Sequence, residues 1–295
     1  MSKIFKDVEV AAESKCQLGE GPVWNTTTNR VNFVDIFGKK VFTFDTETNK
    51  LDSFATALSP GAVIPTNESS FVLAMDDGLY LTDFHGSESK LILSLEADIP
   101  GNRMNDAKCD AQGRLFAGTM GDGATPSGSL YLIEKGRATK IREKVTVSNG
   151  LAWSPDNKVF YYIDSALNSV LSSDYSLENP SAISFKTFIE FPSSYGIPDG
   201  MCSDQEGGIW VAFFGGSAVH RFSKDGTQTH TIEMPVNQIT SCAFKPDSSL
   251  LYITTASLDI EGKPLSPLAG NLFCVDVGIE GLPVAQFNLT NFMHP

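Results

Sequence analysis

The sequence has no long apolar run and little positive charge. No uninterrupted apolar stretch approaches the roughly 20 residues of a membrane-spanning helix, and no apolar leader follows Met1. The chain has 22 Lys and Arg residues against 35 Asp and Glu, for a formal charge of -13. Such a chain repels phosphate backbones and anionic membrane surfaces. We therefore expect no nucleic-acid partner, no membrane association and a cytoplasmic location.

Cysteine and histidine are also scarce. The five cysteines are scattered and form no CxxC pair, so neither a structural zinc site nor a redox motif is indicated. We expect buried thiols in a reducing compartment. No GxSxG elbow, P-loop, Rossmann fingerprint or EF-hand loop is present. None of the four histidines begins one of the repeats described next, which disfavours a histidine metal site or a Ser-His-Asp triad.

One pattern recurs six times along the chain: a small or polar residue, a short apolar strand, a turn rich in Asp, Asn, Gly, Pro and Ser, and a β-branched or aromatic strand. The copies are EGPVWNTTTNRVNFVD from Glu20, GAVIPTNESSFVLAM from Gly61, NDAKCDAQGRLFAGT from Asn105, NGLAWSPDNKVFYYID from Asn149, DGMCSDQEGGIWVAF from Asp199 and TSCAFKPDSSLLYIT from Thr240.

These copies predict a β-propeller. They begin about 41 to 50 residues apart, a spacing typical of four-stranded blades, and no amphipathic helix interrupts them. A third strand is expected after each pair, within residues 40–45, 79–82, 129–133, 169–174, 218–222 and 271–275. We predict an all-β, six-bladed propeller formed as a single domain by residues 1–295, with seven blades as the alternative. Residues 8–12 are expected to complete the last blade.

Equivalent positions of a propeller converge on its central channel. The first residues of the six copies should therefore form a ring at one mouth: Glu20, Gly61, Asn105, Asn149, Asp199 and Thr240. Carboxylate and amide oxygens suit a hard divalent cation, although Asp and Asn before a strand also serve as turn residues.

Other residues lie close to this ring. Arg103 should overhang the mouth, where its guanidinium could clamp a substrate oxygen; a surface salt bridge is the alternative. Asp106 should point away from Asn105 along the strand and serve a structural role. The three tryptophans should pack between blades.

At these residues the chain resembles the family of regucalcin, the gluconolactonases and the luciferin-regenerating enzyme, with the strongest likeness to regucalcin. The resemblance runs from about Cys16 to Gly281 and is carried by LGEGPVW at Leu18, NRMNDAKCDAQGRLFAGTM at Asn102, SNGLAWSPDNKVFYYIDS at Ser148, IPDGMCSDQEGGIWVA at Ile197 and TSCAFKPD at Thr240.

The resemblance implies a six-bladed propeller with one divalent metal ion (Ca²⁺, Zn²⁺, Mn²⁺ or Mg²⁺) in its channel. It implies Glu20, Asn149 and Asp199 as metal ligands, Asp199 as the general base, and Arg103 and Asn105 as substrate-binding residues. The implied activity is that of a lactonase, a hydrolase of aldonolactones such as gluconolactone. One position departs from the pattern: Gly123 stands where lactonases of this family carry an acid that contacts substrate.

Two other functions remain open at this stage. The protein could bind calcium in a regulatory role without turnover, or it could be an arylesterase or phosphotriesterase that uses the same metal site. A small lactone or ester is the expected substrate, and a monomer is the expected state.

Overall fold

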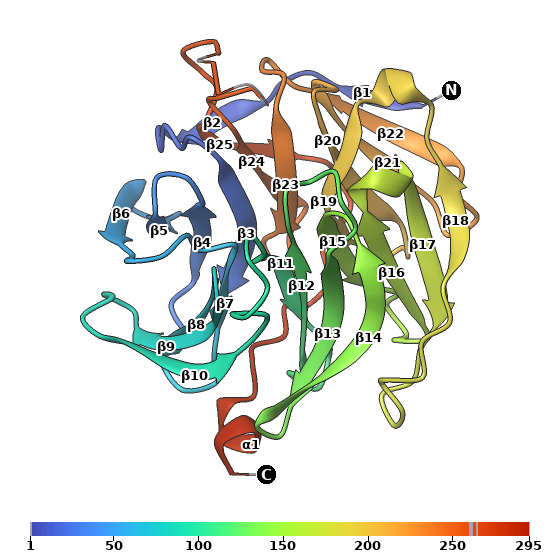
Figure 1. Cartoon of the computed structure of the whole chain (residues 1–295). Helices are drawn as coiled ribbons and strands as arrows, with labels where there is room; N and C mark the ends of the chain where they lie inside the picture. Colours follow the sequence, from blue (N-terminus) through green and yellow to red (C-terminus); the bar gives the residue numbers. More distant parts are fainter. Residues whose placement is uncertain (1, 260–261, 264, 295) are drawn as a thin grey trace.

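The computed structural model describes residues 2–259, 262–263 and 265–294. It is an all-β propeller of six sheets arranged around a central channel (Figure 1). The first strands of successive sheets contact one another in a closed ring, and β23 contacts β3 to complete it. Six blades are thus confirmed, and the seven-bladed alternative is wrong. In the described part of the chain, no helix is long and apolar enough to cross a membrane.

Each blade is an antiparallel sheet whose strands follow one another in sequence. The first blade consists of β3 (Gly19–Asn25), β4 (Arg30–Asp35), β5 (Lys40–Asp45) and β6 (Lys50–Ala55). The second consists of β7 (Ala62–Pro65), β8 (Ser70–Met75), β9 (Gly78–Asp83) and β10 (Ser89–Ser94). The third consists of β11 (Arg103–Cys109), β12 (Leu115–Met120), β13 (Gly128–Glu134) and β14 (Arg137–Val145). The fourth blade consists of β15 (Ser148–Trp153), β16 (Val159–Asp164), β17 (Ser169–Asp174) and β18 (Lys186–Glu190). The fifth consists of β19 (Ile197–Ser203), β20 (Ile209–Phe214), β21 (Ala218–Phe222) and β22 (Gln228–Glu233). The sixth contains β23 (Ile239–Phe244), β24 (Leu250–Thr255) and β25 (Leu272–Asp276). The six predicted third strands coincide with β5, β9, β13, β17, β21 and β25.

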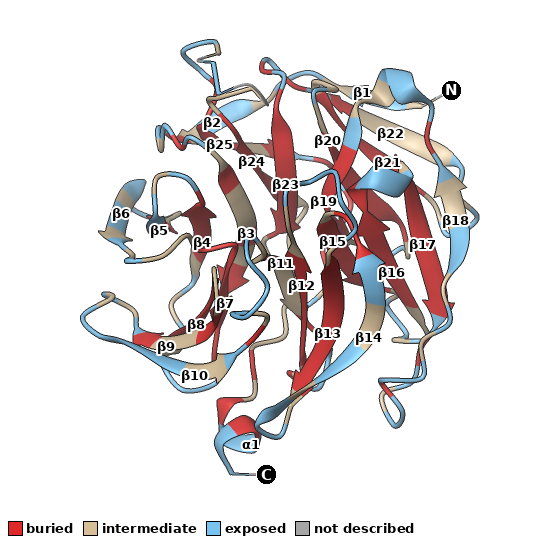
Figure 2. Ribbon diagram, in the orientation of Figure 1, coloured by how far each residue is buried: buried red, intermediate tan, exposed pale blue. Residues whose placement is uncertain are grey.

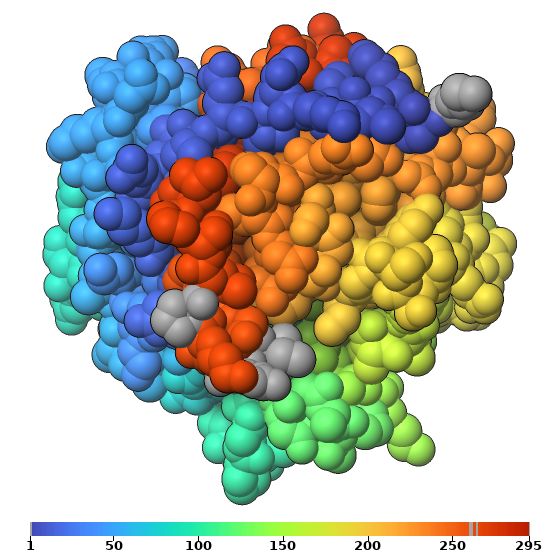
Figure 3. All heavy atoms as spheres, turned by 90° about the horizontal axis from the view of Figure 1, so that it is seen from above, coloured from blue at the N-terminus to red at the C-terminus, as the bar shows by residue number. Residues whose placement is uncertain are grey.

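The N-terminal segment closes the ring. Strand β2 (Glu9–Ala12) pairs with β25 and completes the last blade, as predicted. Strand β1 (Lys3–Phe5), which the sequence did not indicate, pairs in parallel with β22 of the preceding blade. The space-filling view shows this segment lying over the residues of both blades (Figure 3). Two neighbouring blades are thereby tied to one segment, whose strands β1 and β2 form their outermost strands.

The inner and middle strands of the blades carry most of the buried residues (Figure 2), and apolar side chains of neighbouring blades pack together in shared clusters. The indole of Trp153 packs against Phe116 of the preceding blade, with ring centroids 5.3 Å apart. Trp24 stacks on Tyr252 of the last blade, and Trp210 meets Phe244. The prediction of tryptophans between blades is confirmed. All five cysteines are free thiols, and four of them are buried.

The C-terminal segment crosses the end of the channel. After β25, Gly281 forms bridges with Asp204 of the fifth blade and Pro246 of the sixth. The chain then reaches the second blade, where Phe287 pairs with Thr66, and ends in α1 (Leu289–Met293). This segment, residues 281–287, is called the strap below (Figure 1).

Candidate metal and catalytic site

The ring residues gather because the inner strands of all six blades run in one direction. Glu20, Asn105, Asn149 and Asp199 each lie near the start of an inner strand, so they come to the same mouth of the channel. The inner strands β3, β11, β15, β19 and β23 each contain a register irregularity at or next to the ring position. Such bulges change the direction of side chains locally, and here they do so at the channel.

A chain of hydrogen bonds determines how the amide of Asn149 is oriented. The hydroxyl of Ser165 donates to the carbonyl oxygen of Pro198 at 2.6 Å, which can only accept. Ser165 Oγ therefore accepts from Asn149 Nδ2 at 2.8 Å. The other end of the amide, Oδ1, accepts from Asn105 Nδ2 at 2.7 Å. The oxygen of Asn149 is held on the Asn105 side and keeps one lone pair for another ligand.

Arg103 continues this chain from the third blade. Its Nη1 donates to Asn105 Oδ1 at 2.7 Å and to the carbonyl oxygen of Met104 at 3.0 Å. Burial lowers the pKa of Arg103, and the negative charges of Glu20, Asp76 and Asp199 act against that shift. No salt bridge of Arg103 is found in the described residues. Its guanidinium thus stands at the acidic mouth with donors left for another oxygen.

The carboxyl groups of Glu20 and Asp199 are desolvated together. Burial is the main cause that raises the pKa of Glu20, to about 8. Burial and the charge of Glu20 raise the pKa of Asp199 well above its ordinary value. The Oδ1 atom of Asp199 is buried without a hydrogen-bond partner in the described structure. An unpaired buried carboxylate oxygen is costly unless a cation or a donor approaches it.

Asp106 also acts on this acidic group through its charge, an effect that the predicted structural role did not include. The register of β11 shifts between Met104 and Ala107, which breaks the simple alternation of side chains. The negative charge of Asp106 helps to raise the pKa of Glu20 and of Asp199. Asp106 therefore acts on both carboxyl groups through its charge.

The remaining two ring positions do not offer ligands to the channel. A Cβ atom on Gly61 would lie 2.5 Å from the carbonyl oxygen of Met104, so glycine lets the third blade approach closely. Thr240 is fully buried, and its hydroxyl bonds to the carbonyl oxygen of Gly19 at 2.5 Å and to Thr254 Oγ1 at 2.9 Å. Thr240 was predicted as a member of the ring at the mouth, but its hydroxyl instead joins the last blade to the first.

The donor set left at the mouth suits a hard cation. The buried carboxyl group of Asp199, the half-buried one of Glu20 and a fixed amide oxygen are ligands of the kind that Ca²⁺ and Mg²⁺ prefer. No group of three or more His, Cys, Asp and Glu side chains within metal-binding reach occurs in the described residues. A cation here would accordingly have a mixed set of carboxylate and amide oxygens, with Asp106 outside it. Two desolvated carboxyl groups beside an unpartnered oxygen fit such an ion.

The loop at residues 121–127 lies beside Arg103, since Arg103 pairs with Met120 at the end of β12. Asp122 closes this loop by accepting from the backbone amides of Ala124 and Thr125. Gly123 has a φ of +77°, which favours glycine, and it presents no side chain to the mouth.

Ser165 and Asn102 were missed by sequence reasoning. Asn102 Nδ2 donates to Glu96 Oε2 at 2.7 Å and to the carbonyl oxygen of Ser127 at 3.0 Å, which anchors the chain just before Arg103. Ser165 directly follows the fourth repeat, and its role depends on the neighbouring blade. No repeat signal could have identified it, because the other copies end differently.

The fold and this mouth together define a six-bladed propeller with an oxygen-rich acidic site at its channel. The chain matches the family description "SMP-30/Gluconolactonase/LRE-like region" over residues 18–257. It belongs to that family.

Individual relatives agree with this assignment. Regucalcin of Xenopus laevis is 33% identical over 292 residues, which cover 95% of this chain and 98% of the relative. A luciferin-regenerating enzyme structure superposes with a TM-score of 0.89 at 29% identity, covering 95% of this chain and 99% of the other. A calcium-binding protein, regucalcin, from Agrobacterium tumefaciens also gives 0.89 at 29% identity, covering 98% and 99%.

Proposed function

We propose that this protein is a divalent-metal-dependent hydrolase that opens small lactones at the mouth formed by Glu20, Asn149 and Asp199. The observation that carries the proposal is the unpartnered Oδ1 of Asp199, buried beside a second desolvated carboxyl group. Family membership supports a lactonase, since gluconolactonases belong to the same family. All the proposed site residues come from one chain, and we propose that the monomer is the active unit.

Glu20, Asn149 and Asp199 would hold the metal ion through oxygen atoms. The bound ion supplies positive charge that polarises an ester carbonyl and makes a nearby water more acidic. The hydrogen bond from Asn105 to Asn149 Oδ1 orients that ligand beforehand. Relatives named regucalcin, one of them described as a calcium-binding protein, support a divalent cation at this position.

Asp199 is the proposed general base. Its Oδ1 atom is buried without a hydrogen-bond partner in the described structure, so this oxygen is open to a proton from water. It removes a proton from the attacking water, whose oxygen bonds to the acyl carbon. The bond from that carbon to the ring oxygen breaks, and the ring oxygen takes the proton from Asp199. One water is consumed, and the product is the hydroxy acid.

Arg103 and Asn105 are the proposed substrate-binding residues. The Arg103 guanidinium is held by two hydrogen bonds through Nη1, which leaves other N–H groups free to meet a substrate oxygen. Such fixed donors stabilise negative charge that develops on a carbonyl oxygen during the attack. Gly123 offers no acid beside Arg103 to contact a substrate hydroxyl. We therefore propose that the lactones preferred by this protein depend less on such a hydroxyl than the substrates of family members that carry the acid.

The test is hydrolysis of a panel of aldonolactones by metal-stripped protein to which Ca²⁺, Mg²⁺, Mn²⁺ and Zn²⁺ are returned separately. We expect cleavage only after a metal is added. Asp199→Asn should lose at least about a hundredfold in kcat, the scale of general-base catalysis, while its far-UV circular dichroism stays unchanged. Asp122→Asn, which replaces an exposed carboxylate on the loop next to Arg103, is the matched control and should retain activity.

A calcium-binding protein without turnover is the second candidate, favoured by the names of its relatives. Its ion would stabilise the channel rather than serve chemistry. In that case no lactone would be cleaved with any metal, and Asp199→Asn would mainly lower the thermal midpoint and the metal affinity. Full lactonase activity in Asp199→Asn would contradict the assigned base.

A further inference from the structure

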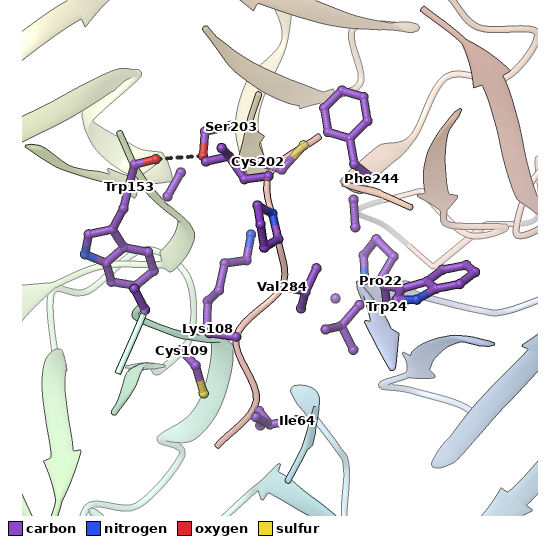
Figure 4. A pocket seen from close by; sticks show the side chains of 18 of the residues that line it. Pro22, Trp24, Ile64, Lys108, Cys109, Trp153, Cys202, Ser203, Phe244 and Val284 are labelled. Atoms are coloured by element: carbon purple, nitrogen blue, oxygen red, sulfur yellow. Dashed lines mark hydrogen bonds between the residues drawn. The ribbon is translucent and has the colours of Figure 1, made fainter. Parts of the chain in front are cut away.

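A cavity of about 280 Å³ lies among the inner strands, next to the strap (Figure 4). It is walled by the later residues of the inner strands and by the strap. Trp24 and Phe244 lie on one side, Trp153 on another, and Val284 of the strap between them. The volume is close to the lower limit of about 300 Å³ for ordinary small-molecule pockets. The cavity has room for a compact organic molecule.

The cavity meets the acidic group of the proposed metal site only at its wall, where Gly21, which follows Glu20, and Asp106 line it. Glu20, Asn149 and Asp199 do not line it. They stand near the beginnings of their inner strands, whereas Trp24 and Trp153 stand at or next to the ends of theirs. A ligand in the cavity would thus enter from the mouth that the strap crosses.

One cation stands in this space, which is lined mainly by apolar side chains together with the acid Asp106 and a few hydroxyl and amide side chains. Lys108 is the only Lys or Arg among the described lining residues. Its Nζ donates one hydrogen bond, of 2.7 Å, to the carbonyl oxygen of Met201. An ammonium group has three donors, so two further N–H groups remain for a ligand. In Figure 4 the Lys108 side chain extends into the middle of the pocket, between Trp153 and Val284.

Asp106 does not occupy those donors. It also lines the cavity, but Lys108 and Asp106 form no salt bridge among the ion pairs of the described chain. The Oδ1 atom of Asp106 accepts from the backbone amide of Ala107 at 2.8 Å instead. Burial raises the pKa of Asp106 and the nearby charge of Lys108 acts against that rise, so the two groups attract each other. No hydrogen bond between them is found in the described residues, and the remaining N–H groups of Lys108 can meet an incoming oxygen.

We propose that this mouth is a second binding site, for a small apolar or aromatic carboxylate whose acid group meets Lys108. The apolar walls would cover the body of the ligand, and the single cation would select its charged end. A carboxylate is favoured over a neutral group because hydrogen bonds between ions are about twice as strong as neutral ones. This site goes beyond the proposed hydrolase and requires neither its metal nor its substrate.

The test uses phenylacetate and its neutral analogue phenylacetamide, with binding measured by ligand-observed NMR on the metal-free full chain. We expect the wild-type protein to bind phenylacetate more tightly than phenylacetamide. Lys108→Met should weaken phenylacetate by about tenfold or more and leave phenylacetamide nearly unchanged. Lys140→Met, which removes a 41% exposed lysine of β14 that does not line the cavity, is the matched control.

A second variant tests the location. Val284→Trp fills the cavity from a partly exposed segment and should abolish binding of both probes; if it unfolds early, Ala285→Phe on the same strap replaces it. Absence of phenylacetate binding at millimolar concentration would overturn the proposal. Equal binding of both probes, or binding that survives the filled cavity, would do the same. Lactonase assays are not involved, so failure here leaves the proposed hydrolase untouched.

Discussion

Asn105 Nδ2 donates a hydrogen bond of 2.7 Å to Asn149 Oδ1, and this bond joins the third and fourth blades at the mouth of the channel. The amide of Asn149 is also held from behind by Ser165. A proposed metal ligand is therefore positioned from two sides by residues that do not themselves need to touch the ion. Such outer contacts commonly determine metal affinity as strongly as the ligands do.

Removing the anchor behind Asn149 should weaken metal binding. In Ser165→Ala the Asn149 amide loses its acceptor at Nδ2 and is free to rotate. We expect a loss of about tenfold to a hundredfold in metal affinity, measured by calorimetric titration of stripped protein. Ser203→Ala is the control, because that hydroxyl bonds to the carbonyl oxygen of Trp153 at the other end of the channel. Equal metal affinity in both variants would contradict the role given to Ser165.

Arg103→Lys should separate substrate binding from metal binding. Arg103 bonds to Asn105 Oδ1 and to the Met104 carbonyl oxygen through Nη1, and its other N–H groups can meet the substrate. Lysine has a single ammonium group in place of this planar fork, so it cannot make all of these contacts with the same geometry. We expect kcat/KM for a lactone to fall by about tenfold or more, with metal affinity within about twofold of wild type. Steady-state kinetics and metal titration together test this. An unchanged KM and kcat would remove Arg103 from the proposed substrate site.

The ion pair of Arg221 and Asp204 should matter strongly for stability. Arg221 Nε lies 2.7 Å from Asp204 Oδ2, and both side chains are nearly inaccessible. Arg221→Met leaves a buried carboxylate without its cation and should cost about 3 kcal/mol or more in the free energy of unfolding. Arg30→Met breaks a half-exposed pair with Asp45 and should cost less than about 1 kcal/mol. Urea unfolding of the two variants makes the comparison, and equal losses would refute it.

Acid should destabilise the fold through His220. Burial lowers its pKa to about 4, and Gln228 Nε2 lies 3.0 Å from its Nδ1. The unfolded imidazole has a pKa of about 6.5. The unfolded chain therefore binds the proton first as pH falls, so the contribution of His220 is full above pH 6.5 and is lost progressively down to about pH 4. The loss should total about 3 kcal/mol.

The check is the difference between wild type and His220→Gln in the free energy of unfolding, followed from pH 7 to pH 4. Carboxyl groups titrate in both proteins and largely cancel in that difference. We expect a shallower pH dependence in the variant. Parallel curves would show that the histidine carries no such linkage.

The attachment of the strap to the blades should depend on Phe287, its buried aromatic residue. Phe287 is 1% exposed and packs with Phe292 in the core between the second and third blades. Phe287→Ala should cost about 3 to 5 kcal/mol in the free energy of unfolding, as for other buried aromatics. Met293→Ala, at a side chain that is 46% exposed, should change it by about 0.5 kcal/mol or less. Thermal unfolding of both variants decides whether the strap is anchored there.

The repeated strand pairs were enough to predict the propeller and the residues that lie near the start of its inner strands. Each copy begins with the residue that the structure places near the start of an inner strand, because a fixed repeat length puts equivalent positions at equivalent heights. Completion of the last blade by the N-terminal strand also followed from the pattern, since a ring with an open edge would expose unpaired backbone groups.

The direction of individual side chains depended on the folded strands. A period-two reading turned Asp106 away from Asn105, but the bulge in β11 brings its charge to bear on Glu20 and Asp199. Thr240 was expected to face the opening, yet its hydroxyl is taken by the carbonyl oxygen of Gly19 in the neighbouring blade. Bulges and contacts between blades leave no periodic signal in a single chain.

What the sequence by itself determined is therefore the number of blades and the residues that begin their inner strands. These follow from local turn chemistry and from a repeat length, which are properties of short segments. Only the tertiary structure decided that Ser165 holds Asn149, that Asp106 joins the acidic group, and that the strap and Lys108 enclose a second cavity. Each of those relationships joins segments far apart in the chain, whose distance and orientation exist only once the ring has closed.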